Sequence, residues 1–309
     1  MSSMKVLFVG GGRRVSLAKR FSKAGFSVFA YETDINCPIA EIAQIIDGKR
    51  WADPNLKKHL LEICQKYNIK VLIPLQDAAT TILSQMKEDL QAIGSFVPTS
   101  SEATNEFCLN KSVFHNKLVG SIIYPSPSGD LNEKVIMKPI FGFNSKGLVV
   151  TDYKSYLDNK IENDSKYVVQ AYVENGQEIS VDAYFNRQGK MIDAVPRLRQ
   201  EVQGGEVSRS KTLPRDSYGV VDWVRQIGEE HGVVGPTCCQ FIISPDGKPF
   251  IMEINARFGG GVILSLEAGL NMISLIKREY VQNHQIEPMK YNWRENFSMV
   301  RYFKEHFYA

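Results

Sequence analysis

The sequence predicts two parts of different fold class, an α/β domain with a parallel sheet followed by an α+β domain with antiparallel sheets. Over roughly the first hundred of the 309 residues, short apolar runs alternate with stretches of helical periodicity. That alternation is typical of parallel strands joined by helices. Beyond about residue 105, β-rich runs follow one another with short links, which favours antiparallel pairing. The length of the chain also suits about two domains.

In the N-terminal part, apolar runs and helix signals alternate. The first run stops at three glycines, residues 10–12, and Gly25 is placed to end the helix that follows. Asp53 and Pro54 predict the start of a second helix, because an N-cap residue followed by proline is a helix start signal. The strands predicted here are Lys5–Val9, Phe26–Tyr31 and Ile69–Leu75.

The C-terminal part is mostly β-rich, with one helical stretch around Asp222–Glu230. Its predicted strands are Val135–Lys138, Gly147–Thr151, Tyr167–Val173, Glu178–Phe185, Met191–Arg199, Cys238–Ile243 and Pro249–Asn255. Because the links between most of them are short, we expect hairpins and antiparallel sheets.

Composition excludes several classes of protein. Apolar residues make up 43% and charged residues 23% of the chain, which argues against disorder. The formal charge of +3 is too small to indicate nucleic acid or an anionic membrane as a partner. The five cysteines include no CxxC pair, and no apolar run approaches the roughly 20 residues of a membrane span. The sequence has no signal-peptide core, so we expect a cytoplasmic protein.

The most informative motif is a hairpin near the C-terminus. Asp246-Gly247 is a strong turn signal, and a turn centred there pairs Gln240 with Glu253. Strand alternation then places Glu253, Asn255 and Arg257 on one face. A carboxylate with two amide oxygens suits Mg²⁺ that is also held by phosphates. The alternative is a solvent-facing polar strand, although the three glycines at 259–261 are hard to explain as mere surface.

Two weaker motifs are also compatible with anion binding. The loop between Lys138 and Gly147 combines glycines with lysines, as a phosphate-binding flap requires, or it is an ordinary exposed hairpin loop. Arg197 and Arg199 share a strand face, which is either an exposed cationic surface or an anion contact. The glycines at 10–12 lack the full dinucleotide fingerprint, so an NAD-dependent oxidoreductase is a distant alternative.

Taken in order, these elements resemble the ATP-grasp superfamily, and within it the short proteins similar to carbamoyl phosphate synthase. The resemblance runs from Lys5 to about Gly269. Its supporting pieces are Ile73-Pro74-Leu75-Gln76-Asp77, Asn110-Lys111, Val195-Pro196-Arg197-Leu198-Arg199, and Met252-Glu253-Ile254-Asn255-Ala256-Arg257 with the upstream Gln240. It implies a Rossmann-like pre-ATP-grasp domain over 1–104. An ATP-grasp domain of two α+β subdomains follows over 105–309, with a lid at about 120–172.

The resemblance also implies roles for individual residues. ATP phosphates would contact Lys111 and Lys138, and the flap over them would contain Gly142, Ser145 and Gly147. Adenine would lie at the hinge formed by Gln170, Ala171, Tyr172 and Val173, and the ribose at Glu178. Mg²⁺, with Mn²⁺ as an alternative ion, would be bound by Gln240, Glu253 and Asn255. The acyl phosphate would face Arg257 or Arg199. Ala171 and Gln240 depart from the common pattern, where acidic residues are frequent.

The activity implied is an ATP-dependent ligase that joins a small carboxylate to an amine or a thiol through an acyl phosphate. A phosphoryl enzyme like carbamoyl phosphate synthase, completed by a partner chain, is the second reading. A nucleotide-binding regulator without turnover is the third. A homodimer is common in the superfamily. The identity of both substrates and the roles of Arg13, Arg14 and Asp77 are left open by the sequence.

Overall fold

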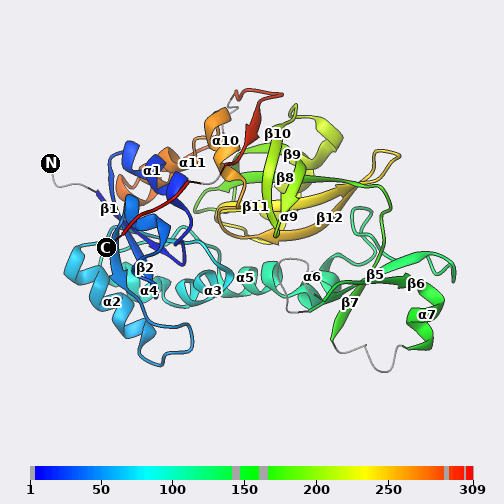
Figure 1. Cartoon of the computed structure of the whole chain (residues 1–309), viewed down its shortest axis with the longest axis horizontal. Coiled ribbons are helices and arrows are strands. Elements are labelled where there is room, and N and C mark those ends of the chain that lie inside the picture. Colours follow the sequence, from blue (N-terminus) through cyan, green and yellow to red (C-terminus); the bar gives the residue numbers. More distant parts are fainter. Residues whose placement is uncertain (1–3, 141–146, 160–165, 289–291, 303, 309) are drawn as a thin grey trace.

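The computed structural model describes residues 4–140, 147–159, 166–288, 292–302 and 304–308. Three sheets organise these residues: a four-stranded N-terminal sheet, a three-stranded sheet, and a large six-stranded sheet. In Figure 1 the N-terminal sheet lies at one end of the long axis and the three-stranded sheet at the other. The large sheet lies between them and above a row of helices, α3, α5 and α6.

The N-terminal sheet is parallel, as predicted, with the order β3-β2-β1-β4. Its strands are β1 (Met4–Val9), β2 (Phe26–Glu32), β3 (Gln44–Asp47) and β4 (Val71–Pro74). Its helical segments are α1 (Val15–Lys23), η1 (Pro38–Glu41), α2 (Leu56–Tyr67), α3 (Asp77–Gln85) and α4 (Lys87–Ala92). The short edge strand β3 was not predicted from the sequence.

The start of α2 differs from the prediction. The helix begins at Leu56, three residues after Asp53. The side chain of Asp53 accepts a hydrogen bond from the backbone N–H of Asn55 at 2.8 Å. An aspartate that closes such a local turn no longer caps the helix behind it. Asp53 and Pro54 therefore form a turn that precedes the helix.

The three-stranded sheet has β5 (Lys134–Pro139) at its centre, flanked by β6 (Val149–Asp152) and β7 (Tyr167–Ala171). Both pairings are antiparallel, as predicted. The helix α7 (Tyr153–Asp158) follows β6, while α5 (Glu102–Leu109) and α6 (Lys111–Leu118) lead from the N-terminal domain toward this sheet (Figure 1). We refer to β5, β6, β7 and α7 as the lid.

The large sheet is antiparallel with the order β12-β11-β8-β9-β10-β13. Its strands are β8 (Gln177–Phe185), β9 (Met191–Gln203), β10 (Glu206–Thr212), β11 (Gly235–Ile243), β12 (Pro249–Asn255) and β13 (Ser298–Val300). The associated helical segments are η2 (Ser217–Gly219), α9 (Val220–Glu230), α10 (Val262–Ala268), α11 (Met272–Ile276) and η3, a π-helical turn (Lys277–Val281).

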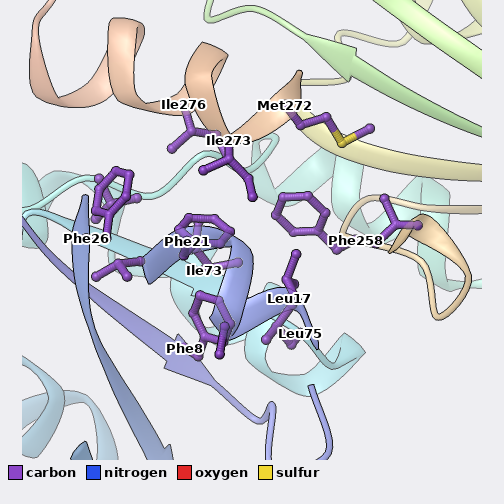
Figure 2. Close-up of a cluster of buried hydrophobic side chains, with 14 of the residues drawn as sticks. Phe8, Leu17, Phe21, Phe26, Ile73, Leu75, Phe258, Met272, Ile273 and Ile276 are labelled. Carbon is purple, nitrogen blue, oxygen red and sulfur yellow. The ribbon is translucent and has the colours of Figure 1, made fainter. Parts of the chain in front are cut away.

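One hydrophobic cluster joins the N-terminal sheet to the C-terminal part of the chain. Phe8 and Phe21 pack edge to face with ring centroids 5.0 Å apart, and Phe21 in turn lies 6.2 Å from Phe258, just beyond β12. Figure 2 shows Phe258 and Met272 of the C-terminal part in one cluster with Phe8, Leu17 and Phe21. The predicted boundary at residue 104 therefore separates two sequence segments that share a core.

The chain end returns to the N-terminal domain. After β13 pairs with β10, the tail crosses from the large sheet toward β1 and β2 (Figure 1). Lys304 then forms an ion pair of 2.8 Å with Glu41. Within the part of the chain that the structure describes, no helix is both long enough and apolar enough to span a membrane.

Candidate active site

The hairpin β11–β12 places the predicted metal-binding residues together. Gln240 lies opposite Glu253, as the turn position predicted, and the side-chain amide of Asn255 donates to Glu253 Oε1 at 2.9 Å. A bulge at this point shifts the pairing by one residue toward the turn, where Phe241 pairs with Ile251. Among the described residues no group of three His, Cys, Asp or Glu side chains could hold a metal. Any ion here would therefore be held by the carboxylate of Glu253 together with amide and phosphate oxygens.

Two arginines contact the amide oxygens of this face. Arg199 donates to Gln240 Oε1 at 2.6 Å, and its Nε lies 3.3 Å from the carboxylate of Glu178. Arg257 donates to Asn255 Oδ1 at 3.0 Å and forms an ion pair with Asp77 at the start of α3. Arg257 therefore bridges Asn255 at the end of β12 and Asp77 of the N-terminal domain.

Glu253 forms no ion pair within the described ranges. Among the described residues its carboxylate accepts a hydrogen bond only from Asn255, and the residue is partly buried. A metal ion at this face would be coordinated directly by the carboxylate of Glu253. To bind the amide oxygens of Gln240 and Asn255 as well, it would replace the hydrogen bonds from Arg199 and Arg257. The donor set fits a hard cation that shares its coordination with phosphate oxygens.

Lys138 lies at the end of β5, on the lid side of the site. The residue is 8% exposed, and burial lowers the pKa of its ammonium to about 8. The negative charges of Glu253 and Glu178 act in the opposite direction, whereas Lys111, at the start of α6, lowers the pKa further. The two lysines and Glu253 thus lie near one another. A buried ammonium that makes no ion pair among the described residues fits a phosphate group.

A cleft of about 460 Å³ runs beside this cluster. Glu178, Arg199 and the backbone around Gly176 line it. The cleft lies between the hinge after β7 and the middle of the large sheet, where the resemblance places the ribose. Its size falls within the roughly 300–1,000 Å³ of small-molecule sites.

At the predicted hinge, some of the backbone groups that would contact adenine already form hydrogen bonds within the protein. The side-chain oxygen of Gln170 is buried and finds no hydrogen-bond partner among the described residues, so it is an available acceptor. The backbone N–H groups of Ala171 and Tyr172 already donate to Pro125 and Lys134, at 2.8 and 2.9 Å. Val173 is half-buried directly after them. Adenine contacts at this hinge would therefore rely on carbonyl groups and on the backbone N–H of Val173.

Part of the predicted flap lies outside the described residues, namely Gly142 and Ser145. Gly147 is described and has a positive φ of 75°. A Cβ atom at this position would lie 3.0 Å from the ring of Pro139. The glycine therefore allows the chain to return closely over the end of β5.

Arg197 is neither an exposed cation nor open to an anion at an active site, so both interpretations of this residue from the sequence are wrong. Its side chain is 2% exposed and pairs with the fully buried Asp182 at 2.7 Å. Ser265 of α10 donates to the same carboxylate at 2.6 Å. Strand alternation does place Arg197 and Arg199 on one face, but α10 and the glycines after β12 cover Arg197.

A second group of charges, near the Gly259–Gly261 loop, was not assigned from the sequence. Arg301 of the C-terminal tail contacts the carbonyl of Gly260 and forms an ion pair of 3.0 Å with Glu206. Arg14 lies 3.5 Å from the carbonyl of Gly259, and burial lowers the pKa of its guanidinium. Arg14 follows the glycine turn at 10–12, a weak signal, whereas no pattern in the sequence singles out Arg301.

Two family models match the chain. One, described as ATP-grasp in the biosynthetic pathway with Ter operon, covers residues 163–302. The other, the PylC-like N-terminal domain, covers residues 6–97. Between them they include the N-terminal sheet, the large sheet and the hairpin β11–β12.

Similarity to curated proteins is confined to parts of longer chains. The multifunctional protein ura1 of Schizosaccharomyces pombe is 31% identical over 150 residues, which is 45% of this chain and 6% of that protein. The alpha subunit of mitochondrial methylcrotonoyl-CoA carboxylase of Dictyostelium discoideum is 21% identical over 214 residues, or 63% of this chain and 29% of the relative. The chain thus spans less than a third of either relative.

Solved structures show the same fold over nearly the whole chain. The biotin carboxylase domain of 2-oxoglutarate carboxylase from Hydrogenobacter thermophilus, with MgADP and bicarbonate, superposes with a TM-score of 0.72 at 14% identity, covering 96% of this chain and 74% of that one. The purK N5-carboxyaminoimidazole ribonucleotide synthetase with ADP gives 0.67 at 16% identity, covering 97% and 83%. The L-amino acid ligase of Bacillus licheniformis gives 0.66 at 14% identity, covering 91% and 75%. Residues 163–302 therefore match an ATP-grasp family model, and the fold over nearly the whole chain is that of ATP-grasp enzymes.

Proposed function

We propose that this protein is an ATP-dependent ligase that phosphorylates a small carboxylate and joins it to an amine or a thiol. The observation that carries the proposal is the meeting of Lys138 and Lys111 from the lid side with Glu253 and its amide neighbours on the large sheet. Cations that neutralise phosphates lie beside one carboxylate that can hold a divalent ion. ATP-grasp enzymes, including the L-amino acid ligase matched above, share this fold.

In this reading Lys138 and Lys111 bind the phosphates, and Glu178 and the oxygen of Gln170 orient the nucleoside. Glu253, Gln240 and Asn255 would hold Mg²⁺, which neutralises charge on phosphate oxygens when bound. Arg257 lies between this face and Asp77. Its planar guanidinium would hold the acceptor carboxylate near the terminal phosphate.

The reaction would proceed in two displacements. An oxygen of the acceptor carboxylate attacks the terminal phosphorus, and ADP leaves. The amine or thiol then attacks the acyl carbon, inorganic phosphate leaves, and the nucleophile loses a proton. The residues of the chain act by positioning and charge neutralisation, so no protein nucleophile is required.

A phosphoryl enzyme that makes carboxyphosphate or carbamoyl phosphate with a partner chain is the second candidate. The neutral amide of Gln240, in a position where many ligases of the superfamily have aspartate, favours it. Bicarbonate as the phosphate acceptor distinguishes this candidate from a ligase that uses an organic carboxylate.

The test is ADP release from ATP and Mg²⁺ across a panel of carboxylates paired with amino acids, with bicarbonate as one member of the panel. We expect ADP to depend on one carboxylate and one amine. Glu253→Ala should reduce turnover by about 10²- to 10³-fold or more, because the metal-stabilised charge is lost. The matched control is Glu62→Ala, since Glu62 is an exposed carboxylate on α2 with only a 3.9 Å ion pair to Lys58.

Two results would contradict the proposal. ATP binding without ADP release in every arm of the panel would indicate a nucleotide-binding regulator. Normal turnover of Glu253→Ala at ordinary Mg²⁺ concentration would remove Glu253 from the metal site.

A further inference from the structure

A second cleft, of about 280 Å³, shares no lining residue with the first cleft, which Glu178 and Arg199 line. It is formed where the N-terminal domain meets the large sheet. Lys87, Phe96 and Val97 line it from the N-terminal domain, and Arg187, Val234 and Tyr280 line it from the other side. The proposed ligase chemistry uses none of these residues.

Arg187 lines this cleft and forms no ion pair with a carboxylate within the described residues. It lies over the ring of Tyr280 at 4.3 Å and near that of Phe96 at 5.4 Å, and it donates to Asn283 Oδ1 at 3.0 Å. Its Nε is buried and has no hydrogen-bond acceptor among the described residues. A guanidinium carries five N–H donors, and the contact with Asn283 uses one of them, so Arg187 keeps donors for an anion in the cleft.

The buried carboxylate of Glu279, next to this cleft, already accepts hydrogen bonds from other groups. Glu279 is 1% exposed, and it accepts hydrogen bonds from the hydroxyl of Tyr184 at 2.6 Å and from the backbone N–H of Arg187 at 3.0 Å. Burial raises the pKa of this carboxyl. Glu279 therefore fixes the backbone of Arg187, and its charge interacts with the guanidinium without an ion pair between the two side chains.

Lys87 adds a second cation to the same cleft. Its ammonium donates to the carbonyl of Thr99 at 2.9 Å and makes no ion pair within the described residues. Burial lowers the pKa of Lys87. Two partly desolvated cations thus line one small space, in which the described lining residues supply no negative charge.

The backbone around Tyr280 is a further, independent sign of function. Tyr280 belongs to the π-helical turn η3, Lys277–Val281. Such turns are rare within helices and occur frequently at functional sites. Here the turn presents the tyrosine ring beneath the guanidinium of Arg187.

We propose that this cleft is a second ligand site, which binds a small organic anion with its acidic group between Arg187 and Lys87 and its apolar part against Phe96, Val97, Val234 and Tyr280. Either a carboxylate or a phosphate satisfies the two cations, because both accept charge-assisted hydrogen bonds. The volume limits the ligand to a compact molecule, about the size of one ring with its acidic substituent.

The experiment is calorimetric titration of the full chain with phenyl phosphate and with benzoate, in the presence of Mg²⁺ and excess ADP to occupy the nucleotide site. Inorganic phosphate and phenol separate the contribution of the acidic group from that of the ring. We expect at least one organic anion to bind about 10-fold or more tightly than inorganic phosphate and than phenol. The comparison of phenyl phosphate with benzoate identifies which acid the site prefers.

Variants locate the binding. Arg187→Gln and Lys87→Met should each weaken the organic anion by about 10-fold or more, because each removes a charge-assisted contact. Lys87→Met keeps the test decisive if Arg187→Gln does not fold. The matched control is Lys190→Met on the same β8–β9 loop, since Lys190 is exposed and already paired with Glu229 at 2.9 Å. Unchanged binding in the Arg187 and Lys87 variants, or no binding of either organic anion at millimolar concentration, would overturn the proposal.

Discussion

Lys138 links the electrostatics of the site to a measurable pH dependence. Its pKa of about 8 in the folded chain lies below the ordinary value of 10.5, so between these two pH values the unfolded chain binds more protons. The contribution of Lys138 to the free energy of unfolding therefore increases as pH rises through that window. Phosphate binding has the opposite dependence, because it requires the protonated ammonium.

We expect ATP affinity to fall as pH rises above about 8, by up to about 10-fold per pH unit, since one proton must be bound with the nucleotide. Lys138→Arg should remove this fall between pH 8 and 9.5, because a guanidinium stays charged there. The measurement is calorimetric ATP affinity at a series of pH values. An identical slope in the arginine variant would show that another group titrates.

Arg257 separates nucleotide binding from turnover. Its guanidinium contacts Asn255 and Asp77 at once, a geometry that a lysine cannot reproduce. We expect Arg257→Lys to leave ATP affinity within a few-fold but to lower turnover by about 10²-fold or more, since phosphoryl transfer needs charge placed at the acceptor. ATP affinity and ADP release are measured together. Arg225→Lys, an exposed arginine paired with Asp222, is the control.

A parallel loss of ATP affinity and turnover in Arg257→Lys would place this residue in nucleotide binding. The proposed contact with the acceptor carboxylate would then be wrong.

At the residue scale, the sequence predicted contacts that follow from local geometry. Gln240 faces Glu253 because a turn signal lies between them, and the bulge falls on the turn side of that pair. The burial of Arg197 was not predicted, because strand alternation shows which face of the sheet a side chain lies on but not which element covers that face. The contacts of Arg14 with Gly259 and of Arg257 with Asp77 join positions 245 and 180 residues apart, which no periodicity can predict.

At the scale of elements, the glycine loop between β12 and α10 packs closely against side chains of the large sheet. A Cβ atom on Gly261 would lie 2.4 Å from Nη1 of the buried Arg197, and one on Gly260 would lie 2.2 Å from the carboxylate of Glu206. Arg197 is held by Asp182, whereas the side chain of Glu206 is 55% exposed and can turn away. The two glycines are therefore not equivalent.

We expect Gly261→Ala to destabilise the fold by about 1–3 kcal/mol, as overpacking of a buried site does, and Gly260→Ala to cost less. Gly260→Ala should displace Glu206 from Arg301 without a large change in the unfolding midpoint. Urea unfolding of both variants against the wild type gives the comparison. Equal midpoints for the two variants would mean that Arg197 is not fixed in place.

Several strongly patterned elements were predicted, whereas the edge strands β3 and β13 and the seven-residue strand β10 inside the large sheet were not. The parallel strands and the hairpin β11–β12 have continuous apolar or alternating patterns. The strand β3 has four residues, of which Gln44 and Asp47 are exposed, so its pattern is too weak to detect. The strand β13 has only three residues, and its pairing with β10 is set by the distant chain rather than by its own sequence.

At the scale of the whole molecule, the shared core couples the two predicted domains. Phe258 is 1% exposed and belongs to the same cluster as Phe8 and Phe21 of the N-terminal domain. Separating the domains would expose this apolar surface to water, at a cost of about 25 cal/mol per Å². A boundary in the sequence at residue 104 therefore does not imply independent stability.

The tryptophans report on the two parts separately, because Trp51 lies in the N-terminal domain and Trp223 in α9. We expect proteins that retain only Trp51 or only Trp223 to unfold in urea with coincident midpoints, which is the test of a single cooperative transition. Phe258→Ala should lower the free energy of unfolding by about 3–5 kcal/mol and lower both midpoints together, since it opens a cavity in the shared core.

The control is Leu60→Ala, a fully buried residue in a cluster confined to the N-terminal domain. It should also lower both midpoints if coupling is complete. A shift of the Trp51 midpoint alone in Leu60→Ala, or separate midpoints in the parent proteins, would show that the N-terminal domain folds on its own despite the contact with Phe258.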